Sequence, residues 1–284
     1  MEEKALRLSA VFLMILTAVS FVLLPKLPAL HTWEAEAREE RIAEEEFAQS
    51  QVTMQNLKIK EQNEAAGAKG ELSIRLPEGV TGDQIAVSSD YVTQTIRVEI
   101  PQADRTYFDS YPVLGNSDYI DGLSYTRQEE TGVIEVTTNK VYELQTEYDT
   151  QTFYFNFLTP HEVYDKVVVI DAGHGGRAVG ANKQGINEKD IDLAIVLKLK
   201  EIFDNSDQNI GVYYTRTDDS NPTFDQRVQL ANKSDADLFI SIHNNSTRSG
   251  RMSGTSGTQV MYVGGEPSVR ADLSGGSHRQ DREP

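Results

Sequence analysis

The chain has 284 residues, of which 38% are hydrophobic and 25% are charged, and its formal net charge is −17. This composition is typical of a globular protein with room for about two domains. The strong acidity disfavours nucleic acid as a partner, because phosphate binding needs clustered lysine and arginine. The sequence contains no cysteine, which excludes a disulfide scaffold and any thiolate metal site.

The first segment, residues 1–30, is predicted to be a membrane anchor or a signal segment. Its apolar run from Leu8 to Leu24 carries no charge and has the length of a short membrane-spanning helix. Lys4 and Arg7 precede the run, which favours an N-terminus inside the cell and export of the rest. A cleaved signal peptide is the alternative, but no good small-x-small cleavage site follows closely. We therefore expect a transmembrane helix, localisation at the cell membrane and an extracytoplasmic chain.

Two segments of different character follow. Residues 31–70 are acidic and rich in helix formers but keep no heptad pattern, which predicts a charged helical linker with a solvated surface. Residues 71–160 contain short alternating or aromatic-rich runs separated by turn signals, which predicts a small antiparallel β-rich domain. The expected strands are Leu72–Leu76, Tyr91–Ile100, Gly132–Thr138 and Thr152–Leu158.

Residues 161–263 change to an α/β pattern. Strands are predicted at Lys166–Ile170, Gly211–Thr215, Leu238–Ile242 and Gly257–Val263, and helices at Lys189–Phe203 and Phe224–Lys233. Alternation of this kind predicts a mostly parallel sheet flanked by helices, joined by right-handed crossovers. On the first helix, the stripe of Ile191, Ile195, Leu199 and Ile202 is expected to be apolar.

Three residues of metal-ligand type converge on one edge of that sheet. His174 follows the strand that ends at Ile170, and His243 directly follows Ile242. Glu188 precedes a helix that would run back along the sheet from the same edge. Because ligands gather beyond the carboxyl ends of parallel strands, these side chains are expected to meet there. Two histidines and one carboxylate are the ligand set of a hydrolytic zinc site with an open position for water.

The residues around His174 fit such a site. Gly173, Gly175 and Gly176 permit a sharp turn and close approach of the loop. Asp171 is a candidate either to accept a hydrogen bond from a ligand imidazole or to satisfy the loop itself. A phosphate-binding loop is the alternative for a glycine-rich turn, but neither G-x-x-x-x-G-K-[ST] nor G-x-G-x-x-G is present. Taken singly, Glu188 also fits a helix-start residue favoured by the helix dipole.

Residues 166–263 resemble the zinc-dependent N-acetylmuramoyl-L-alanine amidases, cell-wall hydrolases of amidase type 3. The matching stretches are VVVIDAGHGG, GANKQGINEKDIDLAIVLKL, VYYTRTDD, RVQLANKSDADLFISIHNN and GTQVMYV, in family order. The resemblance implies that His174, Glu188 and His243 bind Zn²⁺. It also implies cleavage of the amide between N-acetylmuramic acid and L-alanine in peptidoglycan, and action at the bacterial cell wall. Asn244 and Asn245 are candidates to orient the His243 ring or to contact glycan.

The β-rich domain weakly resembles the wall-targeting domain often found ahead of such amidases, and another small β-module is the alternative. In the last segment, residues 264–284, no apolar periodicity is present and the composition predicts disorder. The family places a general-base glutamate near its end, whereas Glu266 and Glu283 lie outside that context. We therefore expect a C-terminally truncated family member, and no catalytic base is identified. A catalytically inactive wall-binding or regulatory protein is the alternative function, and a zinc peptidase of other specificity is a third.

Overall fold

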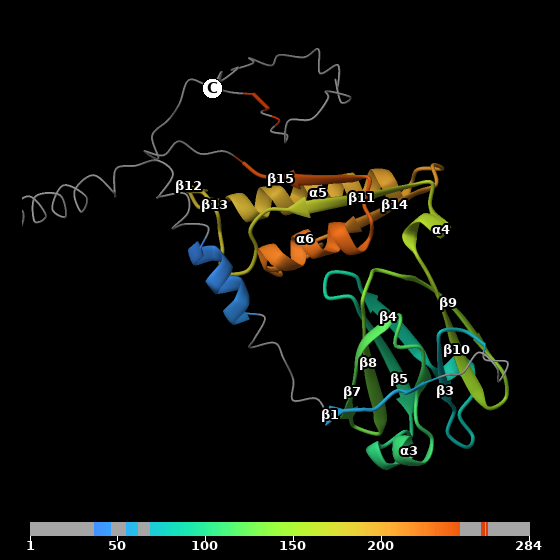
Figure 1. Cartoon of the computed structure of the whole chain (residues 1–284). Coiled ribbons are helices and arrows are strands. Elements are labelled where there is room, and N and C mark those ends of the chain that lie inside the picture. The colour runs from blue at the N-terminus through green and yellow to red at the C-terminus, as the bar shows by residue number, and fades with distance from the viewer. Residues whose placement is uncertain (1–36, 47–54, 62–68, 245–256, 259, 261–284) are drawn as a thin grey trace, which may run out of the picture. The chain divides into compact units, whose positions relative to one another are not determined.

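The computed structural model describes residues 37–46, 55–61, 69–244, 257, 258 and 260 (Figure 1). The predicted membrane anchor of residues 1–30 and the predicted tail of residues 264–284 lie outside these ranges. In the described part of the chain, no helix is both long enough and apolar enough to cross a membrane. The anchor therefore stays a prediction.

The β-rich part contains two five-stranded sheets, ordered β1-β7-β8-β5-β4 and β2-β6-β3-β10-β9. Their strands are β1 Gln55–Asn56, β2 Lys60–Glu61, β3 Leu72–Arg75, β4 Ala86–Asp90, β5 Thr95–Pro101, β6 Leu114–Gly115, β7 Ile120–Gln128, β8 Thr131–Thr138, β9 Glu143–Tyr148 and β10 Thr152–Leu158. A short 3-10 turn at Gly82–Gln84 and the helix α3, Arg105–Ser110, complete this part. All of its strand pairs are antiparallel except β2–β6.

The residue pattern explains these sheets. β5 and β10 alternate strictly between buried and half-buried side chains, as a strand with one face toward a core must. Their inward residues, which include Val98 and Phe155, join a single cluster with Leu72 and Ile134. Strands near the four predicted positions are confirmed by this arrangement, whereas what the β-rich part binds stays a prediction.

The linker prediction for residues 31–70 was wrong in part. Residues 37–46 are helical, but β1 and β2 belong to the two sheets of the β-rich part. The physical reason is that Leu57 and Ile59 pack against the apolar cluster of that part. Polar residues surround these two apolar residues in the sequence, so the pattern indicated a solvated linker and gave no sign of the two strands.

The α/β part is built around three parallel strands, ordered β14-β11-β15. These are β11 Lys166–Ala172, β14 Ile210–Tyr214 and β15 Leu238–Ile242, preceded by the short helix α4, Pro160–Val163. Two longer helices, α5 Glu188–Asp204 and α6 Phe224–Lys233, and a small hairpin of β12 Asn182–Lys183 with β13 Ile186–Asn187 complete it. The strand predicted at residues 257–263 lies largely outside the described residues.

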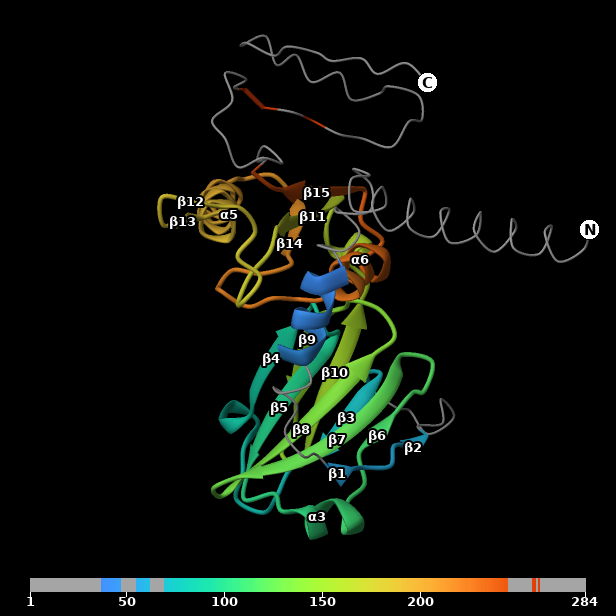
Figure 2. The same cartoon turned by 90° about the vertical axis from the view of Figure 1, so that its left-hand side faces the viewer.

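Helices α5 and α6 lie on opposite sides of this sheet (Figure 2). Val167 and Val169 of β11 pack with Leu230 of α6, whereas Ile170 and Ala172 pack with Val196 of α5. Because successive strand residues point to opposite faces, an unbroken run of apolar residues serves both helices. This is why β11 reads as a continuous β-branched stretch.

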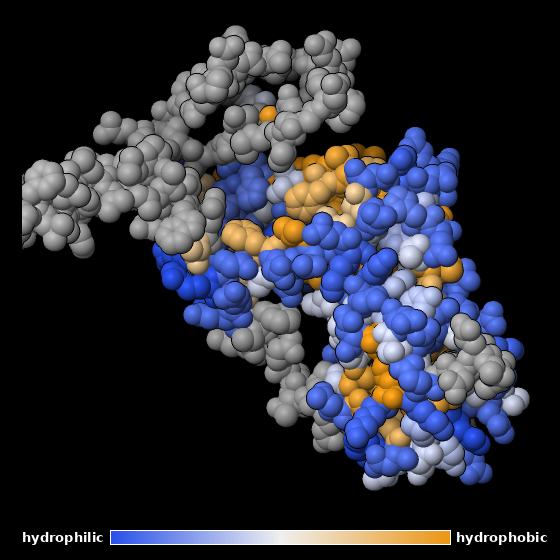
Figure 3. Space-filling view, viewed as in Figure 1, coloured by the Kyte–Doolittle hydropathy of each residue, from blue (hydrophilic) through white to orange (hydrophobic). Residues whose placement is uncertain are grey.

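The stripe expected on α5 meets the core at one residue only, Leu199, which packs against the cluster of Ile170, Ala172 and Val196. Ile191, Ile195 and Ile202 are exposed, and the helix turns Asp192 and Val196 toward the sheet instead. The helix carries apolar residues on several sides, so periodicity alone did not choose the buried one. Figure 3 shows apolar surface over the α/β part. The large exposed apolar side chains of α5 and β15 are Ile191, Ile195, Leu197, Ile202, Leu238 and Phe239.

The fold class also needs a correction. Over the described chain the sheets are mixed, not mostly parallel, because the β-rich part contributes two sheets that are almost wholly antiparallel. Parallel pairing is limited to β2–β6 and to the two pairs made by β11. The three-stranded sheet of the α/β part is thus parallel when taken alone, whereas the sheets of the described chain taken together are mixed.

Candidate metal centre

His174, Glu188 and His243 meet beyond the carboxyl ends of β11 and β15. The His174 Nε2 atom lies 3.2 Å from His243 Nδ1 and 3.3 Å from Glu188 Oε2. Glu188 Oε1 lies 3.4 Å from His243 Nδ1. The register explains the meeting: Ala172 is opposite Ile242, so the residues that follow each strand emerge side by side. The three residues that the sequence predicts to converge thus lie together in the structure.

The spacing of these atoms suits zinc. Ligand atoms about 2.0–2.1 Å from a tetrahedral ion are separated from one another by about 3.3 Å. The three distances, 3.2, 3.3 and 3.4 Å, match that value. Two imidazole nitrogens and a carboxylate oxygen are also donors that zinc accepts, and a three-residue set leaves a fourth position for water or substrate.

Two glycines make the close approach of the rings possible. A Cβ atom at Gly173 would lie 2.3 Å from the His243 ring, and one at Gly180 would lie 2.6 Å from the His174 ring. Both distances are shorter than any real contact, so a larger residue at either position would displace a ring. His174 itself has a φ of 57°, a left-handed conformation that a non-glycine residue rarely adopts and that is often found at functional sites.

Glu188 is the first residue of α5 and is held from two sides. Its Oε2 atom accepts a hydrogen bond from the backbone N–H of Ala181, and its Oε1 atom accepts one from that of Asn244, both at 2.8 Å. Burial opposes ionisation of this carboxyl, but the hydrogen bonds to His174 and His243 and the Ala181 N–H outweigh it, and the pKa of Glu188 is held well below its ordinary value. The carboxylate is therefore charged and fixed in place.

His174 is also strongly perturbed. Burial disfavours its charged form, but hydrogen bonds to Glu188 and Glu39 outweigh burial and raise the pKa of His174 from 6.5 to about 9. The second partner, Glu39, lies in the helix of residues 37–46, with its Oε2 atom 3.0 Å from His174 Nδ1. Without metal, an imidazolium therefore sits between two carboxylates at neutral pH.

The stability of the zinc-free protein should consequently fall as the pH rises. A pKa that is 6.5 in the unfolded chain and about 9 in the folded chain gives a stabilising contribution that is complete below pH 6.5 and is lost as the pH passes about 9. In the presence of a chelator, the Tm of the wild type is expected to drop across this window more than that of His174→Gln. His161→Gln, which changes a histidine outside the cluster, serves as control; parallel Tm curves for wild type and His174→Gln would contradict the expectation.

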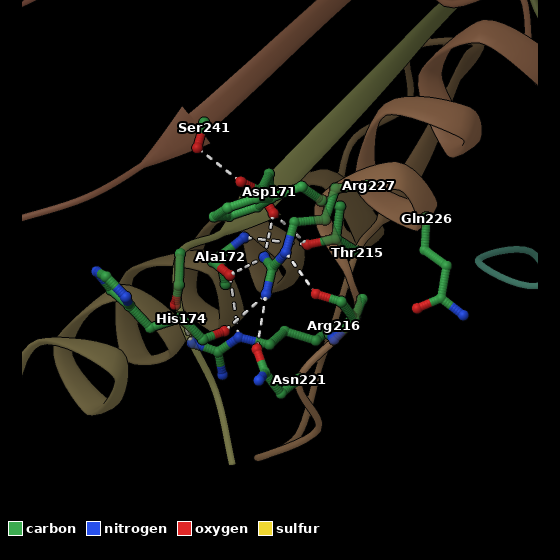
Figure 4. Close-up of polar contacts among 12 residues, drawn as sticks. Asp171, Ala172, His174, Thr215, Arg216, Asn221, Gln226, Arg227 and Ser241 are labelled. Carbon is green, nitrogen blue, oxygen red and sulfur yellow. Dashed lines mark hydrogen bonds and ion pairs between the residues drawn. The ribbon is translucent and has the colours of Figure 1, made fainter. Parts of the chain in front are cut away.

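A buried polar network fixes the loop that carries His174 (Figure 4). Arg227 donates to the carbonyls of Ala172 and His174 at 2.7 and 2.8 Å and pairs with the carboxylate of Asp171. Arg216 donates to the carbonyls of Ala172 and Gly173 at 3.0 and 2.6 Å. The two guanidinium groups thus tie the end of β11 to α6 and to the segment after β14.

The remaining predicted site residues are Asp171, Asn244 and Asn245. Asp171 accepts hydrogen bonds from Thr215, Arg227 and Ser241, so it satisfies this network and does not touch a ligand imidazole. Asn244 contacts Glu188 and, through its side chain, Asp192 at 2.6 Å. Asn245 lies outside the described residues.

Asp192 is the residue that sequence reasoning missed. It is fully buried, and one of its oxygens belongs to the same group of potential metal ligands as the two histidines and Glu188, with all ligand atoms within 4.8 Å. Burial raises its pKa to about 6, although the hydrogen bond from Asn244 opposes the shift. The i, i+4 spacing from Glu188 places both carboxylates on one side of α5 and was the available signal.

Comparison with known proteins shows what this part of the chain is similar to. The family model described as N-acetylmuramoyl-L-alanine amidase matches residues 168–283. This segment is similar to that amidase family. The amidase segment, as we call residues 168–283, contains all four members of the cluster.

Individual relatives are similar to this chain over part of their length. An endolysin of Bacillus phage SPP1 is 45% identical over 30% of this chain and 31% of its own length. The N-acetylmuramoyl-L-alanine amidase CwlM of Bacillus licheniformis is 41% identical over 28% of this chain and 31% of its own length. The chain thus spans about a third of the length of these curated relatives. Among solved structures, the catalytic domain of the Paenibacillus polymyxa amidase CwlV is 41% identical, over 29% of this chain and 47% of that chain, with a TM-score of 0.28.

Proposed function

We propose that the amidase segment hydrolyses the amide bond between N-acetylmuramic acid and L-alanine in peptidoglycan, with a zinc ion held by His174, Glu188 and His243. The observation that carries the proposal is the spacing of 3.2 to 3.4 Å between the two imidazole nitrogens and from each of them to one oxygen of Glu188. The family assignment of residues 168–283 supports the choice of bond. The similarity to proteins named as amidases favours hydrolysis over a non-catalytic wall-binding role.

The chain's own residues prepare the site for this reaction. Zinc, when bound, would polarise the scissile carbonyl and lower the pKa of a bound water toward about 7. Glu188 accepts hydrogen bonds from two backbone N–H groups, and Arg227 and Arg216 hold the backbone of the His174 loop. Ligands fixed in this way need little rearrangement when the metal or the substrate binds, which favours catalysis.

The substrate implies where the protein works. Peptidoglycan lies outside the cytoplasmic membrane, so we propose extracytoplasmic action at the bacterial cell wall. An anchor at residues 8–24 would keep the amidase segment beside that wall, and it belongs to the same proposal.

Digestion of purified sacculi by the full chain tests the reaction. We expect release of intact stem peptides with a free N-terminal L-alanine, while the glycan strands stay uncut; liquid chromatography with mass spectrometry identifies both products. Release should stop after treatment with a chelator and return when zinc is added, since two imidazoles and a carboxylate are ligands that zinc accepts. Stems cut internally would show a peptidase instead, and an unchanged digest with added zinc would refute hydrolysis.

A further inference from the structure

The helix of residues 37–46, called the acidic helix below, contacts the rim of the metal centre through its glutamates. Glu39 Oε2 lies 3.0 Å from His174 Nδ1. Glu40 accepts a hydrogen bond of 2.7 Å from the backbone N–H of Phe224, at the start of α6. Glu46 accepts from the backbone and the side chain of Arg177, both at 3.0 Å. Ala43, on the same helix, is 2% exposed.

The glutamates of the acidic helix accept hydrogen bonds from particular backbone groups near the metal centre. The N–H of Phe224 is one of the donors that a helix start leaves without an intrahelical partner, and Glu40 satisfies it with a negative charge where the helix dipole favours one. Glu46 binds the residue that follows the glycines of the His174 loop. The acidic helix is therefore attached both to the start of α6 and to the His174 loop, and Glu39 lies between these contacts, beside His174 Nδ1.

The two nitrogens of His174 face different partners. Nε2 points to Glu188 and His243, inside the cluster, whereas Nδ1 points to Glu39. A metal-binding imidazole commonly donates its second N–H to a carboxylate, which fixes the tautomer and makes the ligand nitrogen more basic. Asp171, which the sequence suggested for this role, accepts hydrogen bonds from other residues instead. In the described structure the carboxylate beside His174 Nδ1 is that of Glu39.

We infer that Glu39 is a positioning residue for His174, and that docking of the acidic helix and binding of the metal strengthen each other. The inference rests on the proposed zinc site. With Nδ1–H donated to Glu39, the lone pair of Nε2 is directed at the ion. Coupling between two binding events is reciprocal, so bound zinc must also hold the acidic helix more firmly on the amidase segment.

Zinc affinity of the full chain tests the inference, measured by competition with a chromophoric chelator. Glu39→Ala is expected to weaken zinc binding about 10- to 100-fold, the usual cost of losing such a partner. Glu39→Gln should weaken it less, because the amide oxygen still accepts from Nδ1–H. Glu44→Ala is the matched control: it removes the same charge from an exposed position of the same helix and should leave the affinity unchanged.

Hydrogen exchange of residues 37–46 gives a second readout that does not depend on activity. Zinc is expected to slow exchange of the acidic helix in the wild type and in Glu44→Ala, and to have little effect in Glu39→Ala. Equal zinc affinities of Glu39→Ala and Glu44→Ala, with zinc bound by the wild type, would overturn the inference alone. Absence of zinc binding by the wild type would overturn the proposed metal site together with it.

Discussion

Replacing Arg227 with methionine is expected to lower the free energy of unfolding by about 3–5 kcal/mol, the usual cost of breaking a buried ion pair by removing one partner. The Arg227 side chain is 6% exposed and that of Asp171 is 5% exposed. Methionine fills a similar volume but donates no hydrogen bond. The change therefore leaves the carboxylate of Asp171 and the carbonyls of Ala172 and His174 without this partner in a buried place.

Urea denaturation at neutral pH measures the effect. Arg105→Met is the matched control, since Arg105 forms an exposed i, i+4 pair with Asp109 and such pairs contribute only about 0.3–0.5 kcal/mol. Adding Asp171→Asn to Arg227→Met should cost less than Asp171→Asn costs in the wild type, because the charge that it removes is already uncompensated. A stability of Arg227→Met close to that of Arg105→Met would show that the network does not hold the loop.

The meeting of His174 and His243 was predictable because topology decides it. Both residues follow strands of one parallel sheet, and in such a sheet all strand ends of one kind lie on one edge. The apolar runs also located β10, β15 and α6 with their observed bounds. Periodicity is a strong signal when one element buries one face, as in α6, whose Leu230 is fully buried.

The contacts that the sequence did not reveal are those between distant, polar positions. Glu39 and His174 are separated by 135 positions, and one glutamate in an acidic run looks like its neighbours. The role of Asp171 was left open for a related reason, because only the packing of α6 against β11 brings Arg227 to it. On α5, Asp192 is fully buried, and no hydrophobic pattern can predict a buried carboxylate.

Replacing Glu188 with glutamine is expected to weaken zinc binding by roughly 10²- to 10⁴-fold, if a third of the typical binding free energy of a protein zinc site is lost with one ligand of three. The amide of glutamine keeps the size of the side chain but removes the charge that neutralises the ion. It also gives up one of the two acceptors that bind the N–H groups of Ala181 and Asn244. Isothermal titration with zinc, or competition with a chelator for the tighter proteins, measures the change.

The zinc affinity of Asp192→Asn tests whether the metal has three protein ligands and an open position, or four protein ligands. A fourth protein ligand would close the coordination shell, as in structural zinc sites, and leave no place for water. One oxygen of Asp192 already accepts a 2.6 Å hydrogen bond from Asn244. Burial raises the pKa of Asp192 to about 6, whereas the pKa of Glu188 is lowered, so the charged form is stabilised less at Asp192 than at Glu188. We therefore expect Asp192→Asn to change zinc affinity less than about 10-fold. A loss as large as that of Glu188→Gln would make Asp192 the fourth ligand and would argue against hydrolysis at this centre.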